Sequence, residues 1–191
     1  MGIIKSSSAA FPKNQKVLID TNVLYWLTYA NSRVFPTTLK PKEYQTTDYP
    51  SIFEKLIEYG NELFFSNYSI SELASIIARV EASLDGQGSM YQRKNWLRQS
   101  RGRETVSEEL TTVVETIESW ATALTPTPPL SAGQYLERYQ QVYLDGYDIN
   151  IENDISSNGL TYILTDDIDF VSVDGLNIIT ANQQAPKQLL I

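Results

Sequence analysis

Short apolar segments that alternate with helical patterns are the feature that most limits how this chain can fold. Apolar strands are expected at Lys16–Asp20, Leu63–Phe65, Tyr162–Leu164 and Leu176–Ile179. The segments between them carry apolar residues at helical spacing, as Leu73, Ile77 and Val80 do. Strands joined through helices pair in parallel and need helices on both faces of the sheet. The sequence therefore predicts an α/β fold, a three-layer α/β/α sandwich around a central, mainly parallel sheet.

The 191 residues are enough for one sizeable core and short for two. Residues 1–15 are small and polar, which predicts a flexible N-terminal lead-in. Residues 16–191 are predicted to form a single domain with a basic insertion near 86–104. Prolines and threonines in 31–50 predict a loop there.

The composition excludes several kinds of chemistry. The chain has no histidine and no cysteine, so a serine–histidine triad, imidazole-bound metals, thiolate zinc sites and disulfides are excluded. Acid–base or metal chemistry must therefore use oxygen ligands, which favour hard cations such as Mg²⁺ or Mn²⁺. The formal charge is −8, so a polyanionic substrate needs a local basic patch or metal ions.

Four acidic residues follow predicted strands or open predicted helices: Asp20, Glu72, Asp148 and Asp167. Each also has a local explanation, because Asp20 and Asp148 suit helix N-caps, Ser69 and Glu72 suit a capping box, and Asp167 suits a polar turn. Carboxylates at the carboxyl ends of parallel strands point into the crevice where open α/β sheets bind ligands. If the four converge, they form a site for a divalent cation.

The segment after Gly86 carries most of the concentrated positive charge. It contains five of the 15 basic residues and no acid up to position 103: Arg93, Lys94, Arg98, Arg101 and Arg103. Such a cluster in an acidic chain predicts contact with a nucleic acid, and Trp96 within it is suited either to base stacking or to the core. The alternative is a solvated helix face.

The acidic residues lie in blocks that resemble the PIN domain, a nuclease family that includes VapC-like toxins. Val17–Leu24 resembles the family's opening strand and Asp-Thr-Asn turn, and Phe65–Ala74 its second block. Asp148 lies eleven residues before Gly159, as the third acid of the family lies before a helix-ending glycine. Leu164–Phe170 resembles the closing Thr-x-Asp-x-Asp-Phe block. The resemblance spans about residues 16–182, and Asp145 and Asp154 are alternatives for the third acid.

The resemblance implies a metal-dependent ribonuclease, with RNA as its substrate. Asp20, Glu72, Asp148 and Asp167 would be catalytic and would bind Mg²⁺ or Mn²⁺, with Asp169 as a fifth candidate ligand. Thr21, Asn22 and Thr165 would support them. A small protein antitoxin, homodimerisation and a cytoplasmic location without membrane contact are also expected for such a toxin.

Two other functions suit parts of the same pattern. A PIN-like scaffold that binds RNA or protein without cleavage would follow if Asp148 lay outside the cluster. A haloacid-dehalogenase-like phosphatase also places an aspartate after its first strand, but it needs a second aspartate two residues later, where this chain has Asn22.

Overall fold

The computed structural model describes residues 2–33, 35 and 40–184. Its strands form one six-stranded sheet in the order β1-β6-β5-β2-β3-β4, and every pairing is parallel. The strands are β1 (Ile3–Ile4), β2 (Lys16–Ile19), β3 (Glu62–Phe65), β4 (Thr122–Ala123), β5 (Tyr162–Leu164) and β6 (Asn177–Ile179). The predicted sheet is thus confirmed, and it is wholly parallel.

The described residues also form seven α-helices: α1 (Thr21–Leu27), α2 (Glu43–Glu58), α3 (Asn67–Leu84), α4 (Met90–Trp96), α5 (Ser100–Glu118), α6 (Ala132–Gln141) and α7 (Gly146–Ser157). Two short 3₁₀ helices, η1 (Ala30–Ser32) and η2 (Ile168–Ser172), complete the structure. Among these described helices, none is both long and apolar enough to cross a bilayer.

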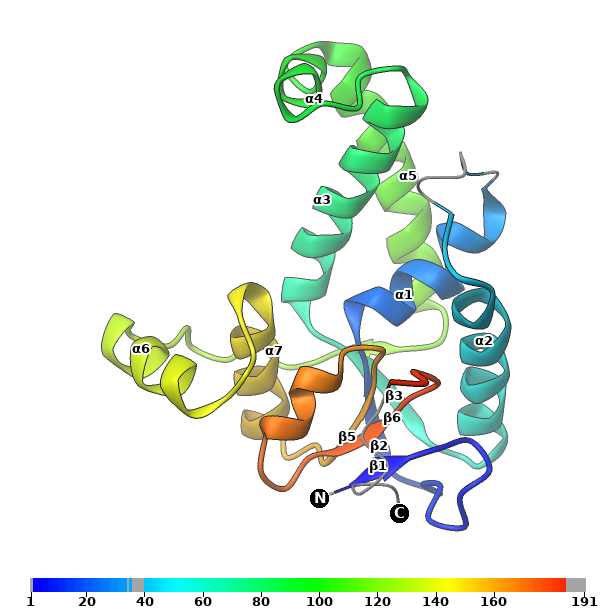
Figure 1. Ribbon diagram of the computed structural model, residues 1–191, viewed down its shortest axis with the longest axis vertical. Coiled ribbons are helices and arrows are strands. Elements are labelled where there is room, and N and C mark those ends of the chain that lie inside the picture. The colour runs from blue at the N-terminus through cyan, green and yellow to red at the C-terminus, as the bar shows by residue number, and fades with distance from the viewer. Residues whose placement is uncertain (1, 34, 36–39, 185–191) are drawn as a thin grey trace.

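Alternation along the strands divides the core between the two faces of the sheet. In β2, Val17 and Ile19 pack with α1, α2, α3 and α5, whereas Leu18 packs with α7 and η2 on the opposite face. The side-chain period of two explains this division, since consecutive residues point to opposite faces. Both faces are therefore buried, which confirms the three-layer α/β/α sandwich (Figure 1).

The N-terminal segment takes part in the sheet, although the sequence predicts a flexible lead-in. Ile3 and Ile4 are buried and pair with Ile178 and Ile179 of β6. The backbone N–H of Ile178 donates to the Gly2 carbonyl at 3.0 Å. A two-residue edge strand has no periodicity that a sequence pattern can detect, and the same is true of β4.

Helix boundaries differ from the prediction in the two proline- and charge-rich regions. Helix α2 begins at Glu43, within the predicted loop, and contains Pro50. Tyr49 accounts for this, because its buried ring packs in the core and its hydroxyl bonds the Thr165 carbonyl. Positions 34 and 36–39 of the predicted loop lie outside the described residues. Helix α5 begins at Ser100, within the predicted basic insertion.

Helices α3 and α5 pack side by side and carry α4 at their far end, as an arm that extends from the sheet (Figure 1). The indole of Trp96 is buried there, and its Nε1 donates to Asp85 Oδ2 at 2.8 Å. Trp96 therefore belongs to the packing of the arm and is not available for base stacking. Gly102 lies against it, so that an added Cβ would approach the Trp96 carbonyl oxygen to 2.4 Å.

A Gly102→Ala variant should unfold at a lower temperature than the wild type. The methyl group has no room against the Trp96 backbone, and overpacking of this kind costs about 1–3 kcal/mol, or several degrees in Tm. The matched control is Gly133→Ala in α6, where a Cβ meets nothing within 4 Å. Alanine should be neutral or slightly stabilising there. Equal melting curves for the two variants would contradict the packing of the arm.

Candidate active site

The sheet order brings three of the four acids to one edge. Strands β5, β2 and β3 are neighbours and parallel, so their carboxyl ends lie together. Asp20 follows β2, Asp167 follows β5, and Glu72 lies near the start of α3, which follows β3. The chain order reverses between β2 and β5, and such a switch point is where open α/β sheets bind their ligands.

Asp20 is the most deeply buried member of this group, with 2% of its surface exposed. It is the N-cap of α1, since the Thr21 N–H donates to its Oδ1 at 2.7 Å. Its other oxygen accepts a 2.6 Å hydrogen bond from Thr165 Oγ1. The Thr165 hydroxyl also accepts from the Asp167 N–H at 2.9 Å, so this threonine connects the ends of β2 and β5.

Burial is the main cause that raises the pKa of Asp20 to about 7. The hydrogen bond from Thr165 opposes this shift, and the charges of Glu72 and Asp167 reinforce it. Asp20 therefore has two properties at once. It caps a helix, as the local explanation requires, and it also lies within the field of two other carboxylates.

Glu72 does not form the predicted capping box. Helix α3 begins at Asn67 with Ser66 as its N-cap, and the Ser66 hydroxyl accepts from the Tyr68 N–H at 3.2 Å. Ser69 is thus inside the helix, one turn before Glu72 on the same side. Within the described residues, three buried side-chain oxygen or nitrogen atoms have no hydrogen-bond partner: Thr21 Oγ1, Ser69 Oγ and Glu72 Oε2. Buried polar atoms are rarely left unpaired, so these atoms indicate a water or ligand site.

Asp148 lies in the first turn of α7, the helix that leads into β5. Burial raises the pKa of Asp148 to about 8. The charges of Asp20, Glu72 and Asp167 act in the same direction, which places all four carboxylates in one electrostatic neighbourhood. The fold therefore places acids from four separate segments of the chain within range of one another's charge.

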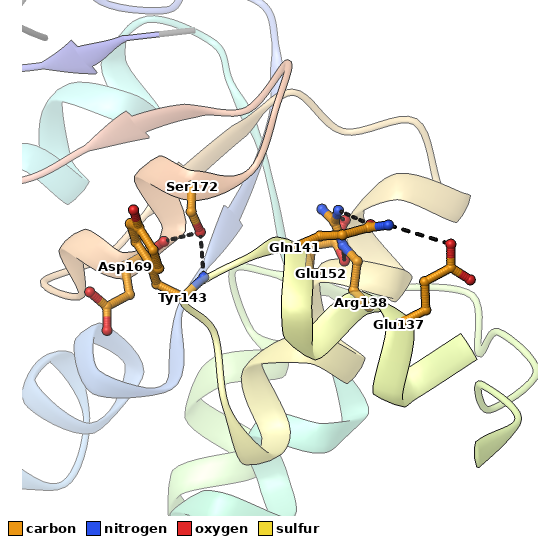
Figure 2. Close-up of polar contacts among 7 residues, drawn as sticks. All are labelled: Glu137, Arg138, Gln141, Tyr143, Glu152, Asp169 and Ser172. Atoms are coloured by element: carbon orange, nitrogen blue, oxygen red, sulfur yellow. Dashed lines mark hydrogen bonds and ion pairs between the residues drawn. The ribbon is translucent and has the colours of Figure 1, made fainter. Parts of the chain in front are cut away.

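Asp167 and Asp169 differ in exposure. Burial raises the pKa of Asp167, the N–H of Asp169 opposes the shift, and the charges of Asp169 and Asp145 add to it. Asp169 is exposed on η2. Its backbone carbonyl accepts a hydrogen bond from Ser172 Oγ at 2.7 Å (Figure 2). The same Ser172 hydroxyl accepts from the Tyr143 N–H at 2.9 Å. Asp169 is thus at the rim of the cluster.

The two alternatives for the third acid occupy different environments. Asp154 is buried and accepts hydrogen bonds from Ser66 and Thr127, so both of its oxygens are already engaged. Asp145 is exposed, yet its charge raises the pKa of both Asp148 and Asp167. The geometry therefore favours Asp148 as the third acid and adds Asp145 to the edge of the site.

Polar residues of α7 fix this helix to its neighbours. Glu152 receives two hydrogen bonds from Arg138 of α6, at 3.0 and 3.1 Å (Figure 2). Asn153 donates to Thr127 Oγ1 at 3.1 Å. These contacts hold α7 against α6 and the preceding loop, and they leave Asp148 on its first turn free of such ties.

The donor set suits a hard divalent cation. Within the described part of the chain, no three acidic side chains form a ready set of ligands to one ion. Mg²⁺ commonly keeps several of its waters and needs only one or two carboxylates. The unpaired Glu72 oxygen, with the influence of the Glu72 charge on the pKa of Asp20, fits an ion held partly through water.

The supporting residues and the basic residues lie at different distances from the acids. Thr21 and Thr165 are fully buried beside Asp20, and Asn22 is partly exposed on α1. The five basic residues predicted to bind RNA instead lie on the arm, far from the acids (Figure 1): Arg93, Lys94, Arg98, Arg101 and Arg103.

No family model and no curated protein matches this sequence. Among solved structures, a chain in the crystal structure of VapBC2 from Rickettsia felis bound to a DNA fragment from their promoter is similar in shape. The two chains share 14% identity over 87% of this chain and 98% of the other, with a TM-score of 0.49. The fold assignment of this chain rests on its own sheet order and connections.

Proposed function

We propose that this chain is a divalent-metal-dependent endoribonuclease that hydrolyses RNA phosphodiester bonds as the toxin of a type II toxin–antitoxin pair. The observation that carries the proposal is the buried, unpaired Glu72 oxygen, together with the charges by which Glu72 and Asp167 raise the pKa of Asp20 and all three raise that of Asp148. Carboxylates in one neighbourhood repel one another unless protons or cations neutralise them. The choice of RNA, and of a small antitoxin and a second copy of the chain as partners, rests on the resemblance to PIN domains.

The ion-binding role falls to Asp20, Glu72, Asp148 and Asp167, directly or through water, with Asp169 at the rim. When bound, Mg²⁺ or Mn²⁺ supplies Lewis-acid chemistry, which offsets charge on the phosphoryl group and favours attack by water at neutral pH. Oxygen ligands suffice for this reaction, so the absence of histidine from the chain is no obstacle.

The surrounding residues position these carboxylates. Thr165 donates to Asp20 and accepts from the Asp167 N–H, so one hydroxyl sets the orientation of both. The Thr21 N–H fixes the second oxygen of Asp20. The Thr21 hydroxyl is buried without a partner in the described structure, which leaves it available to a water or a phosphate oxygen.

Calorimetric titration with Mg²⁺ and Mn²⁺ tests the proposal and separates it from a silent scaffold. The wild type should bind the ion, and Asp20→Asn should bind it at least about tenfold more weakly, because the central carboxylate is lost. Cleavage of mixed cellular RNA should require the ion and stop with a chelator. Ion binding that does not depend on Asp20, without cleavage, would instead support a scaffold.

A further inference from the structure

The tip of the arm is an ordered surface. Ser89 and Gln92 form a capping box that starts α4, with bonds of 3.1 and 3.2 Å. The Trp96 indole is bound to Asp85, and Gly102 packs against it from α5. The side chains on the outer face of α4 are therefore presented by a fixed backbone.

That outer face combines positive charge with an exposed aromatic ring. Tyr91 is 76% exposed and lies three residues before Lys94, which places the two on one side of the helix, opposite the buried Trp96. Arg98 belongs to the same side, since its guanidinium bonds Asn95 Oδ1 at 3.3 Å. We call Tyr91, Lys94 and Arg98 the arm-tip strip.

We propose that the arm-tip strip binds a single-stranded part of the same nucleic acid that enters the acid cluster. This inference rests on the proposed nuclease function. Ammonium and guanidinium groups bind phosphates, and an exposed tyrosine ring stacks on a base, which is the combination that single-stranded nucleic acids require. The acid cluster repels phosphate, and the whole chain has a charge of −8, so RNA needs an attachment point elsewhere.

The length of α3 then sets a minimum length for the substrate. Glu72 lies in the second turn of α3 and the arm-tip strip lies beyond its last residue, Leu84. Twelve helical residues at 1.5 Å each separate the two sites by about 18 Å or more. A strand stacked at about 3.4 Å per nucleotide spans this with roughly five nucleotides. Trinucleotides should therefore reach one site only.

Fluorescence anisotropy with labelled RNA in the presence of a chelator tests the binding step alone. The Lys94→Glu/Arg98→Glu variant should bind a 12-nucleotide RNA at least about tenfold more weakly. The slope of the logarithm of its binding constant against the logarithm of salt concentration should become shallower by about 1.4, the value for two lost phosphate contacts on a single strand. Tyr91→Ala should weaken binding roughly tenfold through the lost stacking. Binding of a trinucleotide should change much less in each variant.

Two controls match these variants. Lys13→Glu/Lys16→Glu makes the same change in net charge at exposed positions near the amino end of β2, opposite the acids. Tyr139→Ala removes another exposed tyrosine, from α6. Equal losses in the controls, or no loss in the arm variants, would overturn the inference. So would arm-dependent binding to anionic phospholipid vesicles with unchanged RNA binding.

The nuclease proposal and the arm inference can fail separately. If the wild type cleaves RNA and the arm variants bind and cleave 12-nucleotide RNA equally well, the nuclease proposal stands and the arm inference is wrong. If the wild type does not cleave RNA but binds it through Tyr91, Lys94 and Arg98, the arm binds RNA as inferred, whereas the nuclease proposal and the link from the arm to the acid cluster are wrong.

Discussion

Asp20→Asn and Asp148→Asn should each cleave RNA at least about 10²-fold more slowly than the wild type at saturating Mg²⁺, while both proteins stay folded. Residues that only orient metal ligands already contribute 10- to 100-fold, so loss of a ligand carboxylate should cost at least as much. Asparagine keeps nearly the same shape, removes the charge and replaces one carboxylate oxygen with an N–H donor. Initial cleavage rates of a labelled RNA, measured beside melting curves, report both properties.

Asp154→Asn is the matched control, because Asp154 lies on the same helix as Asp148 and both of its oxygens accept hydrogen bonds, from Ser66 and Thr127. Weakening those buried bonds should cost about 1–3 kcal/mol of stability and leave the cleavage rate of the folded protein within a few-fold. If Asp154→Asn abolished cleavage and Asp148→Asn did not, the assignment of the third acid would be wrong.

The sheet could be predicted from the sequence because its central strands are short apolar runs with clear ends. Val17 to Ile19 and Tyr162 to Leu164 read as buried strands and are adjacent in the sheet. The edge strands β1 and β4 have two residues each, too few for a periodic pattern. Their positions depend on pairing with β6 and β3, which only the tertiary fold determines.

The candidate site shows the same division between local and long-range information. The acids can be found from local context, since each follows a strand or opens a helix. Local context cannot show which acids belong to the cluster and which serve only the packing of the fold. That distinction depends on partners more than 80 residues away, as in the hydrogen bond from Ser66 to Asp154. In the arm, too, the sequence alone does not show which aromatic side chain is buried. The structure buries Trp96 and exposes Tyr91.

The metal-free protein should become more stable as the pH falls from about 8.5 to 5. The pKa of Asp20 is about 7 in the folded state against an ordinary value of 3.8. Between these values the folded state holds a proton that the unfolded state has released, so each rise in pH favours unfolding. Lowering the pH from 7 to 5 covers about two thirds of the interval between these pKa values, so this buried carboxyl alone contributes about 3 kcal/mol, or roughly 6–12 °C in Tm. The pKa of Asp148 is also raised, to about 8, so the pH range over which stability changes extends to about pH 8.

Melting curves in chelator across this pH range measure the effect, and the chain has no histidine whose titration would overlap it. Asp20→Asn should melt higher than the wild type at pH 8 and show a flatter pH profile, because it lacks the charge that burial and neighbouring acids disfavour. Mg²⁺ at pH 8 should raise the Tm of the wild type and have little effect on Asp20→Asn. A wild-type Tm that is constant or falls toward pH 5 would mean that the four carboxylates do not share one buried site.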